Sequence, residues 1–205
     1  MPAWTIEPAR DEEALGIMID VFVESGYEIK AVLRTIFNSD FFKDARYAKI
    51  KSPAEVVANT LNLVGAYQVP DPTMPSMGLQ SIYMGQTLLD PPSVEGWYTG
   101  KEWINSGSLL ARINFLADRV ADTSMPVVER IIAQIRDDGV TGPEDLMEAC
   151  LEHMGLLELN TDTRDLLLGH VRDEGDLDWS DQAAAGIRIG ELLALVGATT
   201  EYQFN

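Results

Sequence analysis

The sequence predicts an all-α fold, an irregular multi-helix bundle of about eight or nine helices with one long Pro/Gly/Trp-rich loop. Its apolar residues recur at the three- and four-residue spacing of helices, and convincing strand-type alternation is missing. Serine, proline and glycine stand where helices are expected to begin and end. The longest interruption of the helical pattern lies between Leu89 and about Ser106 and contains prolines, glycines and two tryptophans.

Two apolar helical faces open the chain, one before Gly26 and one after it. Gly26 is expected to end the first helix, because glycine readily adopts the left-handed conformation found at helix ends. The two faces consist of Leu15, Met18, Ile19 and Phe22, and then of Ile29, Val32, Leu33, Ile36 and Phe37.

The segment Ser52-Pro53-Ala54-Glu55 predicts the start of a third helix. Ser52 can cap it, Pro53 suits the first turn, and Glu55 can complete a capping box. The prolines of residues 69–75 then predict a loop, and helical spacing resumes from Leu79 to Leu89.

The second half of the chain predicts five further helices, one of them opened by a second capping box at Thr141–Glu144. These helices are expected over residues 109–120, 125–135, 144–153, 161–172 and 181–195. Polarity rises near residue 122, which suggests a helical core with the aromatic loop (1–122) and an acidic helical subdomain (123–205). A single continuous domain is the alternative, because short amphipathic helices need one another to bury their faces.

The chain has 205 residues and a formal net charge of −18, with an isoelectric point of about 4.3. Such a surface repels phosphate backbones and anionic lipids, so no nucleic-acid binding is expected. No apolar run is long enough to span a bilayer, so no membrane insertion is expected. Residues 1–13 lack a basic segment followed by an apolar one, which argues against a signal peptide.

Residues suited to metal or nucleophilic chemistry do not form a known motif. His153 and His170 are far apart and are expected on helix surfaces, and Cys150 is expected to be a buried thiol. The acidic run from Asp173 to Asp181 lacks the spacing of an EF-hand and is interpreted as a solvated linker. No GxSxG, P-loop or GxGxxG sequence occurs, so no cofactor and no metal site are predicted and no catalytic residue is assigned.

The Trp-rich loop is the candidate ligand-binding site. Its aromatic rings could stack on the faces of sugars while neighbouring polar side chains supply hydrogen bonds. The structural alternative, which we favour, is that Trp97 and Trp103 anchor the loop, with Lys51, Glu55 and Arg112 as an ion-pair network beneath it. The candidate binding residues are Glu95, Trp97, Tyr98, Trp103, Asn105 and Arg112.

An ordered set of short motifs resembles the C-terminal half of the bacterial family known as domain of unknown function number eighteen-hundred. The strongest part is Pro91-Pro92-Ser93-Val94-Glu95-Gly96-Trp97 followed by Trp103-Ile104-Asn105. The other motifs are Phe37-Asn38-Ser39-Asp40-Phe41-Phe42, Lys51-Ser52-Pro53-Ala54-Glu55, Met84-Gly85-Gln86 and Leu110-Ala111-Arg112, with a looser match at Glu201–Asn205.

The resemblance implies a largely helical protein related to longer, often exported bacterial proteins, and it carries over no catalytic residue. It suggests an exported or periplasmic location, with the cytoplasm as the alternative. The first functional hypothesis is a non-catalytic helical interaction or assembly domain that uses an apolar patch between Leu15 and Phe37 to bind a protein partner or the missing N-terminal half. The alternatives are a carbohydrate- or polymer-binding module that uses the loop, and a hydrolase that uses carboxylates such as Glu55 and Glu95.

Overall fold

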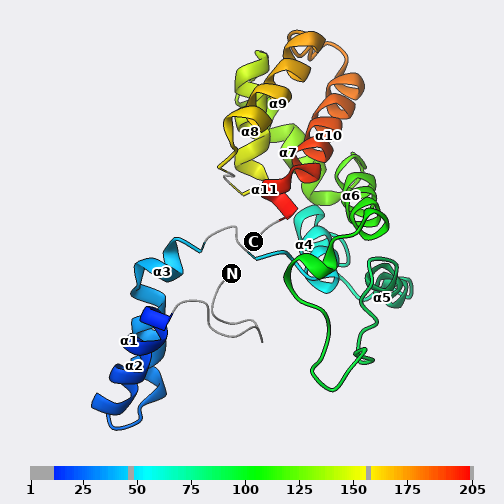
Figure 1. The fold of residues 1–205 in the computed structure, drawn as a ribbon. Coiled ribbons are helices and arrows are strands. Elements are labelled where there is room, and N and C mark those ends of the chain that lie inside the picture. Colours follow the sequence, from blue (N-terminus) through cyan, green and yellow to red (C-terminus); the bar gives the residue numbers. More distant parts are fainter. Residues whose placement is uncertain (1–11, 46–48, 156–157, 204–205) are drawn as a thin grey trace. The chain divides into compact units, whose positions relative to one another are not determined.

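The computed structural model describes residues 12–45, 49–155 and 158–203. In these ranges it contains eleven α-helices, one 3-10 helix and no named strand, which confirms the all-α prediction (Figure 1). The count exceeds the predicted eight or nine because the four-residue helices α3 (Asp40–Lys43) and α11 (Thr200–Gln203) are too short to show a periodic pattern. The chain forms two compact units, residues 1–50 with 204–205 and residues 51–203.

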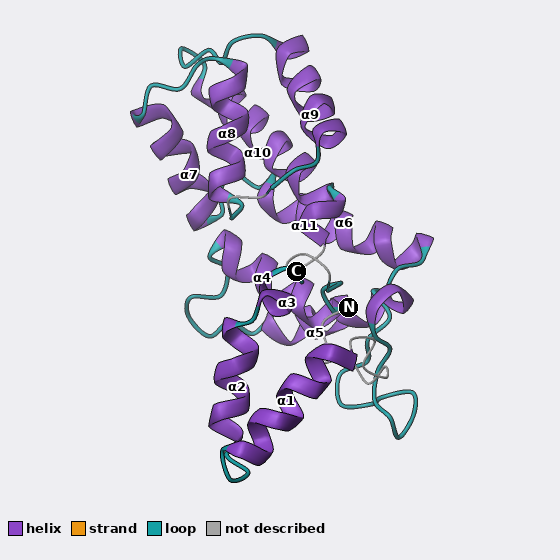
Figure 2. Cartoon of the chain, turned by 60° about the vertical axis from the view of Figure 1, so that its left-hand side comes forward, coloured by secondary structure: helices purple, strands orange, loops and turns teal. Residues whose placement is uncertain are grey.

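The first unit is built around a hairpin of two helices, α1 (Glu12–Glu24) and α2 (Ile29–Asn38), which lie side by side (Figure 2). Gly26 adopts a φ of +71°, and the Tyr27 amide donates to the Phe22 carbonyl over 2.8 Å, so the first helix ends as predicted. The short α3 follows, and its N-cap Ser39 accepts a hydrogen bond from the Phe42 amide.

The second unit opens with α4 (Pro53–Val64), whose capping box is formed as the sequence predicted. The next helix, α5 (Met74–Tyr83), corrects two expected boundaries. It begins inside the expected loop, because Pro75 lies in the first turn, where a missing amide hydrogen costs no helical bond. It ends before the expected Leu89, because Gly85 has a φ of +99° and Leu89 itself a φ of +66°.

The remaining helices follow the predicted order. The expected capping box at Thr141–Glu144 is wrong: Gly142 is the N-cap and makes no side-chain bond, while the Thr141 carbonyl accepts from the Leu177 amide at 2.8 Å. The helices are η1 (Gly100–Trp103), α6 (Ser106–Val120), α7 (Pro126–Asp137), α8 (Pro143–His153), α9 (Thr161–Glu174) and α10 (Gln182–Ala198), before α11.

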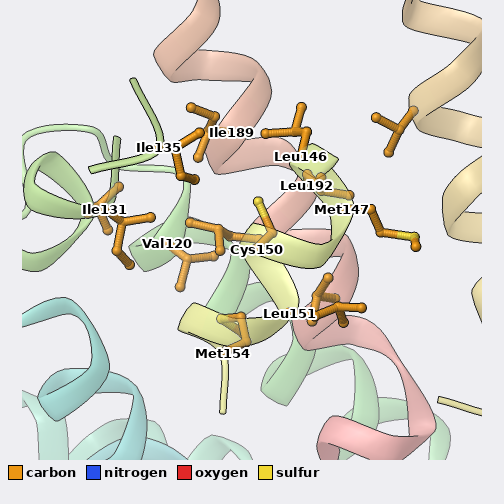
Figure 3. Packing of buried hydrophobic residues seen from close by; sticks show 14 of the residues in the cluster. Val120, Ile131, Ile135, Leu146, Met147, Cys150, Leu151, Met154, Ile189 and Leu192 are labelled. Atoms are coloured by element: carbon orange, nitrogen blue, oxygen red, sulfur yellow. The ribbon is translucent and has the colours of Figure 1, made fainter. Parts of the chain in front are cut away.

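The main core of the second unit lies between α6, α7, α8, α9 and α10 (Figure 3). Val120 before residue 122 and Ile131, Cys150 and Ile189 after it belong to the same cluster. Residues on both sides of the expected domain boundary therefore share one core, and the separate folding of residues 123–205 stays a prediction. Among the described residues, no helix combines the length and apolar character required to cross a membrane.

Small residues lie where α10 packs against α6. Gly190 and Gly197 of α10 face α6 and the residue that follows it. A Cβ atom at Gly190 would lie 3.0 Å from the Ala121 Cα, and one at Gly197 would lie 2.1 Å from a methyl carbon of Leu116. A side chain at position 190 would therefore press on the backbone after α6, and one at position 197 would overlap the buried Leu116 side chain.

Candidate functional site

The Trp-rich loop runs from the end of α5 to the start of α6 and is held by its own polar groups. The indole Nε1 of Trp97 donates to the Thr87 carbonyl at 3.0 Å, which ties two parts of the loop together. An isolated β-bridge joins Ser93 to Gly96, whose φ is +107°. These contacts join segments of the loop on both sides of its two prolines.

Two aromatic rings of the loop, Tyr98 and Trp103, do not lie in one plane. Trp103 is buried, with 5% of its surface exposed, whereas Tyr98 is 51% exposed. The two rings meet edge to face, with centroids 6.1 Å apart and planes at 86°. Such a pair stabilises a packed loop, and it lacks the coplanar exposed rings that stacking on a sugar requires.

The two polar candidates of the loop, Asn105 and Glu95, differ in their contacts. The Asn105 side chain accepts from the Ser108 amide at 2.9 Å and caps α6, so its oxygen already serves the helix. The side chain of Glu95 is exposed near the tip of the loop. Trp97, Tyr98 and Trp103 share the loop with these residues, and glycan binding by this group stays a prediction.

Arg112, the sixth candidate, lies apart from the solvent in the interior of the second unit. It is 0% exposed and is the largest fully buried side chain among the described residues. Its Nη2 donates to the Lys51 carbonyl at 2.6 Å, while Nε and Nη1 have no hydrogen-bond partner in the described part of the chain. Burial lowers the pKa of Arg112 to about 10, and the charge of Glu55 opposes this shift.

Lys51 is a second partly buried cation beside Arg112. Its Nζ donates to the Tyr202 carbonyl at 2.7 Å and lies 4.2 Å from the centroid of the Tyr202 ring. Burial lowers the pKa of Lys51, the charge of Glu55 raises it, and the charge of Arg112 lowers it further. The charges of Lys51, Glu55 and Arg112 therefore influence one another, and the ion-pair network expected from the sequence stays a prediction.

The motifs that are far apart in the sequence meet around α4. The Ala54 amide donates to Gln86 Oε1 at 2.9 Å, and the Ser52 amide donates to Glu55 Oε2 at 2.6 Å. The Lys51 amide donates to the Gln203 carbonyl at 3.4 Å. The sequence did not predict Gln86, Tyr202 or Gln203 as residues of this site. All three nevertheless belong to the motifs that carry the family resemblance.

This arrangement is suited to holding together the start of α4, helix α6 and helix α11. The buried Arg112 and the partly buried Lys51 each donate to a backbone carbonyl, and an oxygen of Glu55 accepts from the backbone at the start of α4. Charged hydrogen bonds of this kind are strong in a low-dielectric interior and costly to leave incomplete. A hydrolytic role for Glu55 and Glu95 stays a prediction, because Glu55 is engaged in its cap and Glu95 is exposed on the loop.

Other reactive groups are buried or serve the helices. Burial raises the pKa of the Cys150 thiol to about 12, which leaves it protonated near neutral pH. His170 lies 3.6 Å from Glu174 on the same helix. Within the described ranges, no three or more His, Cys, Asp or Glu side chains are grouped to hold a metal ion.

The acidic run begins in the last turn of α9 and ends at the N-cap of α10, and its members have local roles. Asp181 caps α10 by accepting from the Ala184 amide at 3.0 Å, and Asp178 accepts from the Ser180 amide at 2.8 Å. Arg188 donates to the carbonyls of Gly175 and Asp176, at 3.0 Å in each case. These bonds agree with the linker interpretation of the sequence.

Comparison with known proteins gives one match. The sequence model of the family described as "Protein of unknown function (DUF1800)" matches residues 4–204, which is most of the chain. The match includes the region of the strongest motifs and extends through the acidic second half. No curated protein and no solved structure matches significantly.

Proposed function

Because the chain belongs to the DUF1800 family, whose function is unknown, we propose its role from its surface: it is a non-catalytic helical interaction domain whose contact surface is the α1–α2 hairpin. One observation carries this proposal. On each helix, three large apolar side chains at positions spaced by four residues are at least 40% exposed; α1 also exposes Ile17, which lies outside this spacing. The six spaced side chains are Leu15, Ile19 and Val23 on α1, and Ile29, Leu33 and Phe37 on α2, here called the apolar face.

The size of the apolar face supports a binding role. A large side chain that is half exposed leaves about 100 Å² in contact with water, so six of them offer about 600 Å². That lies at the upper end of the largest apolar patch found on typical monomers, and such patches commonly mark interaction sites. Burying this area against a helical partner removes the cost of its hydration.

The helix pattern explains why the hairpin cannot cover this surface by itself. On α1, apolar residues span about two thirds of the circumference, while the hairpin seam covers only one side of the helix. Ala14 is buried and Phe22 is half-buried, whereas Ile19 and Val23 point away from them. A helix that is apolar on more than one side needs more than one neighbour to bury its apolar surface.

The proposal is tested by placing a photo-cross-linking amino acid at Leu33 in the protein produced in its own cells. Arg34, the next residue and also exposed, supplies the matched control position. Illumination should give a covalent adduct between position 33 and a separate polypeptide, and little or none from position 34. Circular dichroism confirms that both variants retain the helical fold.

The contrary outcome is a cross-link from position 33 to residues 51–203 of the same chain, identified by peptide mass spectrometry. The apolar face would then be part of an internal contact. Equal adduct formation from both positions would indicate non-specific contact and would also count against the proposal.

A further inference from the structure

We propose that the Trp-rich loop carries a second contact site, in which residues 89–94, here called the proline segment, bind in a groove lined by aromatic side chains on a partner protein. This inference does not depend on the α1–α2 hairpin, because the loop belongs to the second unit. It rests on three features of the proline segment: its exposure, its restricted backbone and its carbonyl groups without partners in the chain.

Every residue of the proline segment is exposed. Leu89 is 95% exposed and Val94 is completely exposed, although both are large and apolar. Figure 1 shows the loop between α5 and α6 extending away from the helices of the second unit. Exposed turns usually carry glycine and small polar residues, so a leucine and a valine on either side of two prolines indicate more than a connection.

The backbone conformation of Leu89 is unfavourable for a leucine. Its φ is +66°, in the left-handed region that glycine and asparagine adopt more easily. Since the side chain is exposed, packing within the described part of the chain does not compensate for this strain. A contact with another molecule would compensate for it, and we therefore assign Leu89 to the binding site.

The two prolines restrict the backbone before any partner is bound. Their rings fix φ at about −65°, and each proline also restricts the residue before it, Asp90 or Pro91, to extended conformations. The Asp90 amide donates to the Thr87 carbonyl at 3.2 Å, and the Gly96 amide donates to the Ser93 carbonyl at 3.1 Å, so both ends of the segment are held. Aromatic-lined grooves recognise extended proline segments, which lose little conformational entropy on binding.

The carbonyl groups of Asp90, Pro91 and Pro92 are available to a partner. Within the described residues, none of the three accepts a hydrogen bond. Tryptophan and tyrosine offer both an apolar face for a proline ring and an N–H or O–H group that donates to a carbonyl. The partner groove should therefore be lined by these two residue types.

Charge favours a protein partner over a lipid surface. Asp90 and Glu95 are exposed beside Leu89 and Val94, and residues 85–100 contain no lysine or arginine. Insertion of the loop into a bilayer would bring both carboxylates to the headgroups, and a chain with a net charge of −18 is repelled by anionic lipids. A groove on a protein can accommodate the apolar side chains and leave the carboxylates in water.

Photo-cross-linking of the full chain in an extract of its own cells tests this proposal. The photoreactive amino acid is placed at the exposed Glu95, and the exposed Asp165 of α9 supplies the matched control position. Position 95 should form an adduct with a separate protein, attached near a tryptophan or tyrosine, and position 165 should form little or none. A proline homopolymer should remove most of this adduct, whereas a glycine–serine polymer of equal length should not.

A pair of double variants supplies the second measurement. Pro91→Ala combined with Pro92→Ala should lose most of the adduct from position 95, because the freed backbone must then be ordered on binding. The same changes at Pro70 and Pro72, exposed prolines of the loop before α5, should retain it. Far-UV circular dichroism establishes that both double variants are folded, and the polymer competition decides the question without any proline variant.

Four outcomes would overturn the inference. They are no protein adduct from position 95, equal adducts from positions 95 and 165, an adduct that survives the proline homopolymer, and full retention of the adduct after both loop prolines are changed. Attachment to a glycan or a lipid in place of a protein would count as the first of these. The cross-link from position 33 is unaffected by these changes, so failure here leaves the proposed function of the hairpin standing.

Discussion

The two units use similar apolar helices with opposite results. In the described part of the first unit, α1 and α2 contain one buried apolar residue each, Ala14 and Ile36, and expose the six side chains of the apolar face. In the second unit, five helices surround a shared core in which Ile189, Cys150 and Val196 are completely buried. The difference teaches that amphipathic helices make a closed core only when enough neighbours meet around them.

The two units also differ in the burial of their basic residues. The second unit buries Arg112 and partly buries Lys51, and it provides carbonyl and carboxylate partners for them. In the first unit, Lys30 and Arg34 are exposed. Three matched pairs of substitutions, one member in each unit, can break or sharpen this comparison.

The largest contrast is expected between Arg112→Ala and Arg34→Ala. Removal of the buried guanidinium leaves the Lys51 carbonyl and the Glu55 charge without it, so the free energy of unfolding should fall by about 3–5 kcal/mol. Arg34→Ala should change this free energy by less than about 0.5 kcal/mol. Urea denaturation followed by far-UV circular dichroism measures both, and equal effects would contradict the structural role of Arg112.

The next contrast is between Ile189→Ala and Ile19→Ala. Ile189 is 0% exposed, so its truncation leaves a cavity and should lower the free energy of unfolding by about 2–5 kcal/mol. Ile19 is 53% exposed, and the same change should lower the free energy of unfolding of the isolated monomer by less than about 1 kcal/mol. A large loss from Ile19→Ala at low protein concentration would show that the apolar face is covered within one chain.

The smallest contrast is between Gly197→Ala and Gly16→Ala, and here the signs differ. The new methyl group at position 197 would overlap Leu116, which is itself buried, so unfolding should become easier by about 1–3 kcal/mol. At Gly16 no atom lies within 4 Å of the new carbon, and the helix should gain about 0.5–1 kcal/mol. Thermal unfolding distinguishes the two, and stabilisation at both sites would mean that α10 and α6 pack less closely than described.

The fold was largely predictable because its signals are local. The Ser52 capping box, the Gly26 helix end and the 3.6-residue apolar period each depend on neighbours within a few residues. The errors arose where one local signal had two meanings. Pro75 was taken as part of a loop but lies in the first turn of α5, and Thr141 resembled a cap while its neighbour Gly142 takes that position.

The candidate site was only partly predictable because its residues are joined by tertiary contacts. The sequence singled out Arg112 and Lys51, yet their carbonyl partners and the approach of Tyr202 come from segments more than sixty residues apart. The local sequence pattern also did not determine which side chains are buried. Trp97 and Trp103 lie in the same loop, but only Trp103 is buried. Such differences depend on the helices against which the loop packs.

The sequence by itself determined the helical class, the order of the longer helices, the shape-defining turns and the acidic surface, because propensity, capping and charge act over short distances. The tertiary structure alone decided which apolar faces are covered. It closed α6 to α10 around a core through Gly190 and Gly197, and it left the stripes of α1 and α2 exposed. Burial is a property of the whole assembly of helices, so identical local patterns can end in a core or on a surface.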